Sequence, residues 1–152
     1  MTDWSESQRV RLAYEERLLG KEFSHFSLYD RAKGGLTTVR GEHITSANRA
    51  YGLCIWISIG YPHQMPNLYV TSPSPLLDSG GKPITGYKTS HLMHVWESDW
   101  NNYVKICHCK DAFWSASMTL VNVLMKGMLW LEAYEFHCKT GRSIDAYSLT
   151  YA

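Results

Sequence analysis

The fold of this 152-residue chain is decided by residues 53–71, LCIWISIGYPHQMPNLYVT. Four aliphatic side chains in the first half alternate with other residues, which is the period-two pattern of a strand that buries one face. They are Leu53, Ile55, Ile57 and Ile59. A turn at residues 60–62 ends this strand, and residues 68–71 predict the next one. Two successive strands joined by one turn predict an antiparallel meander.

An amphipathic helix is expected near the N-terminus. Ser5 followed by Gln8 matches a capping box, apolar residues then recur at helical spacing, and Gly20 offers a stop. The recurring residues are Val10, Ala13, Tyr14 and Leu18. Between this helix and the strand, residues 23–28 and 37–39 flank a glycine-rich turn, and a hairpin is predicted there.

A second, longer helix is expected after a loop rich in Pro, Gly and Ser that runs from Ser72 to Ser90. Ser115 or Ser117 can cap this helix, and Gly141 can end it. Its apolar residues fall at intervals of three and four: Met118, Val121, Leu124, Met125, Met128, Leu131 and Tyr134. The order of helix, strands, long loop and helix predicts one α+β domain over residues 1–152, in which two helices pack on one antiparallel sheet.

Charge and composition exclude some classes of partner. Fifteen Lys and Arg stand against fourteen Asp and Glu, so a formal charge of +1 supplies no basic face for a nucleic acid. The first ten residues hold no apolar run that resembles a signal peptide, and residues 118–131, the longest apolar stretch, are interrupted by Asn122 and Lys126. We therefore expect a cytoplasmic protein without membrane partners, whose four cysteines are free thiols.

Cys107 is the strongest candidate for chemistry. It lies in YVKICHCKDAFWSAS, residues 103–117, after the long loop and shortly before the second helix, and this position exposes a thiol on a rigid support. A thiolate is a better nucleophile than a thiol, and His108, Lys105, Lys110 or a helix N-terminus can each favour the anion. The alternative interpretation is a small buried hydrophobic residue.

Two separated motifs resemble the ubiquitin-conjugating enzyme family. The sequence YPHQMPNL, residues 61–68, is similar to the family's Tyr-Pro-x-x-x-Pro turn between two meander strands. Ile106-Cys107, with Trp114 seven residues after the cysteine, is similar to the family's active-site cysteine and the tryptophan that opens the next helix. The two motifs occur in the family's order.

Further residues resemble the bacterial members of this family. His94-Val95-Trp96 is similar to the His-x-aromatic strand ahead of their cysteine. WLEAYE, residues 130–135, followed by Thr-Gly at 140–141, is similar to their Trp-Leu-x-x-Tyr-Glu helix and its end. The resemblance covers residues 10–145 and implies the ubiquitin-conjugating-enzyme-like fold.

The resemblance implies a transferase that carries an acyl group as a thioester on Cys107 and needs no cofactor. The cysteine takes the C-terminal acyl group of a protein from a donor thioester and passes it to a protein or to a small amine. The bacterial relatives resemble components of antiphage operons, in which the donor is the C-terminus of a cyclic-oligonucleotide synthase. The resemblance implies the same donor here.

The residue that stabilises the oxyanion is left open by the sequence. Eukaryotic enzymes of this family carry a His-Pro-Asn element whose Asn supports the oxyanion, whereas residues 91–94, His-Leu-Met-His, have neither Pro nor Asn. Asn101 or Asn102 in the following loop, or His94 itself, is the candidate donor.

Two other functions stay open. A non-catalytic binding module of the same fold holds a partner around residues 61–67 and leaves Cys107 unused. A zinc site is the second alternative, although Cys-x-Cys lacks the spacing of a zinc knuckle. Its candidate ligands are Cys107, His108, Cys109, His91, His94, His137 and Cys138. Cys109 also competes for the role of nucleophile, at five residues from Trp114 rather than seven.

Overall fold

The strand predicted from the alternating aliphatic residues is the centre of the sheet. The computed structural model describes residues 3–86 and 88–147, and it confirms the predicted α+β architecture with an antiparallel sheet. Strand β3 pairs antiparallel with β2 before it and with β4 after it. The elements are α1 (Glu6–Glu22), β1 (Ser27–Tyr29), β2 (Thr38–Ile44), β3 (Ala50–Trp56), β4 (Asn67–Ser72), η1 (Ile84–Gly86), β5 (Val95–Trp96), β6 (Val104–Ile106), η2 (Asp111–Phe113), α2 (Leu120–Thr140) and η3 (Ile144–Tyr147).

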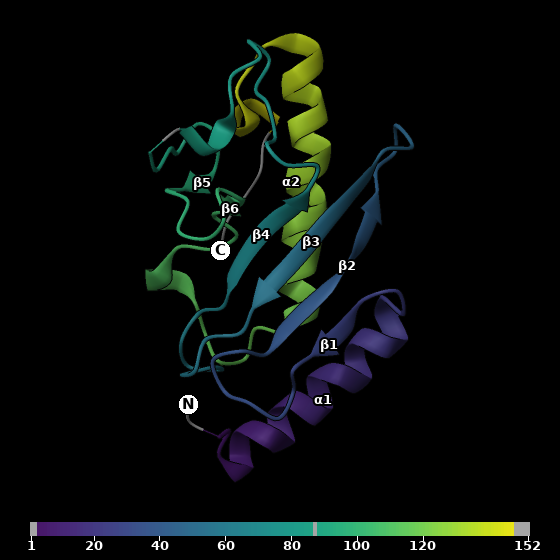
Figure 1. Ribbon diagram of the computed structural model, residues 1–152, viewed down its shortest axis with the longest axis vertical. Helices are drawn as coiled ribbons and strands as arrows, with labels where there is room; N and C mark the ends of the chain where they lie inside the picture. Colours follow the sequence, from purple (N-terminus) through teal and green to yellow (C-terminus); the bar gives the residue numbers. More distant parts are fainter. Residues whose placement is uncertain (1–2, 87, 148–152) are drawn as a thin grey trace.

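The strand order β1-β2-β3-β4-β6-β5 departs from a simple meander only at its last two strands. The first four strands follow one another in space, and β1 and β2 form the predicted hairpin. The long loop after β4 then carries the chain to the outer strand β5, and β6 returns between β5 and β4. Figure 1 shows β5 and β6 at the edge of the sheet opposite β1 and α1. The segment that follows β6 is therefore held at this edge.

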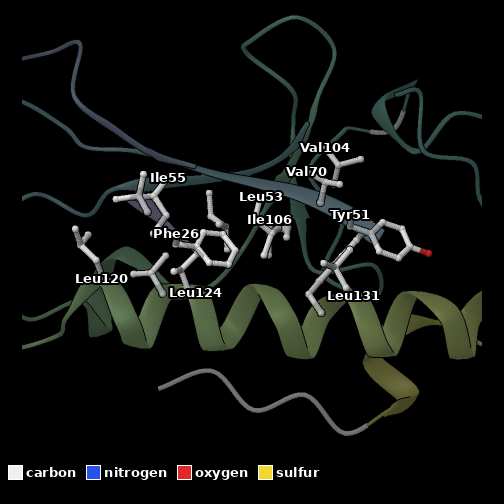
Figure 2. Close-up of a cluster of buried hydrophobic side chains, with 14 of the residues drawn as sticks. Phe26, Tyr51, Leu53, Ile55, Val70, Val104, Ile106, Leu120, Leu124 and Leu131 are labelled. Carbon is white, nitrogen blue, oxygen red and sulfur yellow. The ribbon is translucent and has the colours of Figure 1, made fainter. Parts of the chain in front are cut away.

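One face of the sheet packs against α2 (Figure 2). The buried side chains between them include Leu53, Ile55, Val70, Ile106, Leu124 and Leu131. Helix and sheet approach closely at Gly127, where a Cβ atom would lie 3.0 Å from Leu68 and 3.3 Å from Leu53. Leu53, Ile55 and Ile57 are buried as the pattern predicts, but Cys54 on the opposite face of β3 is buried as well, and Ile59 is 45% exposed.

The buried face of α1 differs from the predicted apolar face. The capping box of Ser5 and Gln8 is present, but the helix continues past Gly20 to Glu22. Val10 and Tyr14 are 66% and 51% exposed. The buried residues are instead Leu12, Glu15 and Leu19. Apolar spacing could not indicate this face because its central residue is a carboxylate.

The N-cap of α2 differs from the prediction, whereas its predicted end at Gly141 is confirmed. Thr119 caps the helix and forms a capping box with Asn122. Ser115 and Ser117 are wrong as caps, because their hydroxyl groups are hydrogen-bonded to each other at 2.9 Å ahead of the helix. Gly141 follows the last turn with φ 75°, the left-handed conformation that glycine adopts without strain. Within the described ranges, no helix combines the length and the apolar character needed to cross a membrane.

Candidate functional site

Cys107 follows β6 directly and is partly exposed. Its backbone N–H donates to the carbonyl oxygen of His94 at 2.8 Å, which extends the β5–β6 pairing of Ile106 with Val95 by one residue. The other three cysteines differ in exposure: Cys54 and Cys109 are buried, whereas Cys138 is exposed near the end of α2. Cys107 is therefore a partly exposed thiol between the long loop and α2, as the sequence predicts, and the structure adds that it follows an ordered strand.

Two hydrogen bonds tie the chain after Cys107 to the turn between β3 and β4. The buried His108 binds the carbonyl oxygen of Pro66 through Nε2 at 2.8 Å. The indole Nε1 of Trp114 donates to the carbonyl oxygen of Pro62 at 2.9 Å. The two rings also meet edge to face at 6.1 Å between centroids. The two prolines of the Tyr-Pro-x-x-x-Pro motif thus anchor the residues that flank the thiol.

The surroundings of Cys107 favour the neutral thiol. Burial, with smaller contributions from Cys109 and Asp111, raises the pKa of this thiol to about 11, although Lys110 lowers it. Lys110 therefore acts as the sequence predicts, but its effect is outweighed. His108 is no source of positive charge at pH 7, because burial lowers its pKa to about 4.

Lys105, the remaining predicted cation, is engaged elsewhere. Its ammonium group pairs with Asp99 at 2.8 Å, and Asp99 also accepts a hydrogen bond from the hydroxyl of Tyr69 at 2.7 Å. Asp99 thus links Lys105 of β6 to Tyr69 of β4, and the charge of Lys105 is directed to Asp99 rather than to the thiol.

His94 lies beside Cys107 through its backbone and is held by a carboxylate through its side chain. Its imidazole is buried, and Nε2 lies 2.7 Å from Oδ1 of Asp145 in η3. Its backbone has φ 52°, a left-handed conformation that is uncommon for residues other than glycine. The sequence indicates His94 but not Asp145, which lies 51 residues away and carries no motif.

Asn101 and Asn102 lie at the closed end of the β5–β6 hairpin, whereas Cys107 lies at its open end. Both are exposed and adopt φ values of 49° and 57°. Trp100, just before them, packs edge to face on Trp56 with ring centroids 4.9 Å apart. The structure therefore brings His94, but neither asparagine, next to the Cys107 backbone.

A mostly apolar cavity of about 530 Å³ lies next to Cys109, between this segment and the first half of α2. It is lined by His108, Cys109, Trp114, Met118, Met125 and Leu129, among others. Cys109 is buried and its thiol lies 3.3 Å from the carbonyl oxygen of Lys110, and burial raises its pKa. These features make Cys109 the less accessible of the two neighbouring thiols.

The candidate zinc ligands do not converge. Over residues 3–86 and 88–147, no three His, Cys, Asp or Glu side chains are gathered as a metal site. His137 illustrates this, because Nε2 accepts from the backbone of Ser79 at 3.0 Å and Nδ1 lies 2.7 Å from the carbonyl oxygen of Arg142. The zinc alternative thus has no support in the described geometry.

Comparison of the chain with protein-family models, curated proteins and solved structures gives no match. What the site can do therefore follows from its own geometry. A partly exposed thiol on an ordered strand, with both flanking segments fixed, can hold an acyl group in a defined orientation.

Proposed function

We propose that this chain is a ubiquitin-conjugating-enzyme-like transferase that carries an acyl group as a thioester on Cys107. The observation that supports it most is the anchoring of the cysteine segment: His108 and Trp114 bind the carbonyl groups of Pro66 and Pro62. These contacts connect the two motifs that carry the family resemblance, residues 61–68 and the segment from Cys107 to Trp114. The α+β architecture is compatible with this proposal: α1 precedes the strands of the antiparallel sheet in the sequence, and α2 follows them.

The reaction consists of two balanced exchanges. In the first, the sulfur of Cys107 attacks the carbonyl carbon of a donor thioester, the new carbon–sulfur bond forms, and the donor thiol leaves with the proton of Cys107. In the second, an amine attacks the Cys107 thioester, an amide forms, and the cysteine regains a proton from the amine. No redox step or cofactor enters either exchange.

The raised pKa of Cys107 fits a carrier better than a rapidly reacting nucleophile. At a pKa of about 11, roughly one molecule in ten thousand holds a thiolate at pH 7. The same high pKa makes the sulfur a poor leaving group, since thiols of lower pKa leave faster. An acyl group on Cys107 is therefore long-lived once it is formed.

The proposed donor is the C-terminus of a protein, and the bacterial resemblance favours a cyclic-oligonucleotide synthase of an antiphage operon. The acceptor is the amine of a protein or of a small molecule. Either acceptor must reach the partly exposed thiol that follows β6.

A non-catalytic binding module is the second candidate. It is favoured by the cavity of about 530 Å³ beside Cys109, whose lining is mostly apolar. In this case a partner occupies the cavity and Cys107 forms no covalent bond.

Intact-mass measurement separates the two candidates. The protein is co-expressed with its operon neighbours and examined for an adduct that hydroxylamine removes, as a thioester requires. Cys107→Ala abolishes the adduct under the carrier proposal, whereas the matched Cys109→Ala variant retains it. Absence of any hydroxylamine-sensitive adduct on the wild-type protein with every neighbour contradicts the carrier and favours the binding module.

A further inference from the structure

A chain of contacts leads from the C-terminal segment to the backbone of Cys107. Oδ1 of Asp145 lies 2.7 Å from Nε2 of His94, and the carbonyl oxygen of His94 accepts the N–H of Cys107 at 2.8 Å. The backbone N–H of Asp145 also donates to the carbonyl oxygen of Leu92 at 2.8 Å. The segment after α2 is thus attached twice to the turn that precedes β5.

His94 is the strained member of this chain. Its φ of 52° is less favourable for a residue with a Cβ atom than for glycine. Such a conformation persists only where the surrounding contacts hold it in place. Here the backbone N–H of His94 binds the carbonyl oxygen of His91 at 3.2 Å, and its imidazole binds Asp145. The direction of the His94 carbonyl, and with it the end of the cysteine-bearing strand, depends on these contacts.

We propose that Asp145 is a positioning residue for Cys107: its carboxylate holds the His94 imidazole, and so fixes the backbone that orients the cysteine. This inference rests on the proposed function of Cys107 as the acyl-carrying residue. It does not make Asp145 or His94 a catalytic group, because the contact with Cys107 runs through the backbone.

The protonation state of His94 defines which substitution at position 145 is tolerated. Burial lowers its pKa, His91 and Lys110 lower it further, and Asp145 acts in the opposite direction. The imidazole is therefore neutral at pH 7, and its proton lies on Nε2, facing a carboxylate that accepts. The amide oxygen of Asn can accept the same bond, whereas Ala cannot.

The test compares Asp145→Ala with Asp145→Asn. Alkylation of Cys107 by iodoacetamide is followed against pH by peptide mass spectrometry, and acyl transfer is followed with the donor found by intact mass. Asp145→Ala is expected to lower the pH midpoint of alkylation, because a loosened strand end exposes the thiol, and to slow transfer about tenfold. Asp145→Asn is expected to match the wild type in both.

Glu132→Ala is the matched control for lost stability. Glu132 accepts hydrogen bonds from Ser46 in the turn between β2 and β3, away from the cysteine. Its removal is expected to destabilise the fold and to leave the alkylation midpoint of Cys107 unchanged. A midpoint that moves equally in Glu132→Ala and Asp145→Ala overturns the positioning role.

The outcomes distinguish this inference from the proposed function. A shifted midpoint in Asp145→Ala supports positioning even if no acyl adduct is found on the wild-type protein. An unchanged midpoint and unchanged transfer overturn positioning even if the adduct forms. Should Asp145→Ala fail to fold, nitrogen NMR of wild-type His94 decides: the Nε2–H tautomer at pH 7 supports the contact, and the Nδ1–H tautomer overturns it.

Discussion

The imidazole of His108 donates its Nε2 proton to the carbonyl oxygen of Pro66 over 2.8 Å. A carbonyl only accepts, so the ring nitrogen in this contact carries the proton and defines the tautomer. The residue after the cysteine is thereby bound to the turn between the two central strands. This contact makes the site sensitive to acid, because protonation charges a buried ring.

The first prediction concerns stability below neutral pH. Burial lowers the pKa of His108 from 6.5 to about 4, so between these values the unfolded chain binds a proton that the folded chain does not. The stabilisation is complete above pH 6.5 and is lost as the pH falls toward 4, by about 3 kcal/mol. His94 adds to the loss in the same direction, since burial lowers its pKa as well.

Urea unfolding at pH 7 and pH 5 measures this loss in wild type and in His108→Gln. The glutamine amide keeps a donor toward Pro66 but does not titrate, so the difference between the two pH values should shrink. His63→Gln, an exposed histidine of the same turn, should behave as the wild type. Equal pH dependence in His108→Gln and wild type contradicts the assignment.

The second prediction concerns the Cys107 thiol. With its pKa raised to about 11, alkylation by iodoacetamide should accelerate about tenfold per pH unit between pH 7 and 9. Lys110 lowers this pKa and Asp111 raises it. At pH 8, Asp111→Asn should therefore react faster than wild type and Lys110→Gln more slowly, each by roughly twofold because both charges are exposed.

Peptide mass spectrometry reads the Cys107 rate separately from that of the exposed Cys138. Lys139→Gln, at the other end of α2, serves as the control for a change of net charge and should not alter the Cys107 rate. A Cys107 rate that is flat between pH 7 and 9 would indicate a thiolate that already exists, contrary to the burial of this thiol.

The third prediction concerns the buried carboxylate of α1. Glu15 is fully buried, accepts the backbone N–H of Leu120 at 2.8 Å and pairs with Arg11 at 2.8 Å. Its removal leaves the first amide of α2 without its acceptor and Nε of Arg11 without its carboxylate, while the guanidinium still donates to the carbonyl oxygens of Ala116 and Met118. Glu15→Ala should lower the free energy of unfolding by about 3 kcal/mol in urea titrations.

Glu16→Ala is the matched control on the same helix. Glu16 pairs with Arg31 where both side chains are well exposed, and exposed pairs contribute about 1 kcal/mol at most. Equal losses for Glu15→Ala and Glu16→Ala would mean that the contact between α1 and α2 does not depend on the carboxylate.

Part of this fold is predicted from the sequence, and part depends on contacts between distant residues. The central strands, the Ser5 capping box and the stop at Gly141 are encoded locally, by periodicity and by cap chemistry, and they are confirmed. The buried face of α1 is not local. It is set by Glu15 meeting Leu120, 105 residues away, so a pattern of apolar residues alone indicates the wrong face.

The site divides in the same way. Cys107 and His94 are identifiable because each lies in a motif that resembles the family's. Asp145 has no local signal, since its contact with His94 forms only when the segment after α2 folds back onto the turn before β5. The amide groups of Asn101 and Asn102 make them candidate oxyanion donors, whereas their conformation is typical of turn residues.

The last prediction separates the two roles of those asparagines. With φ values of 49° and 57°, Asn101 and Asn102 occupy a region that asparagine and glycine tolerate better than other residues. Asn101→Ala or Asn102→Ala should lower the free energy of unfolding by about 1 kcal/mol, whereas the Gly variants should stay close to wild type. The Gly variants therefore remove the amide without removing the turn.

Acyl transfer in these Gly variants then tests the oxyanion role directly. If the asparagines serve only the hairpin, both variants transfer at the wild-type rate, because the turn lies at the end of the hairpin away from Cys107. Loss of an oxyanion donor instead slows transfer about a hundredfold or more while stability is kept. Such a loss would require the hairpin end to approach the thiol when donor binds, and single-turnover rates with the identified donor would reveal it.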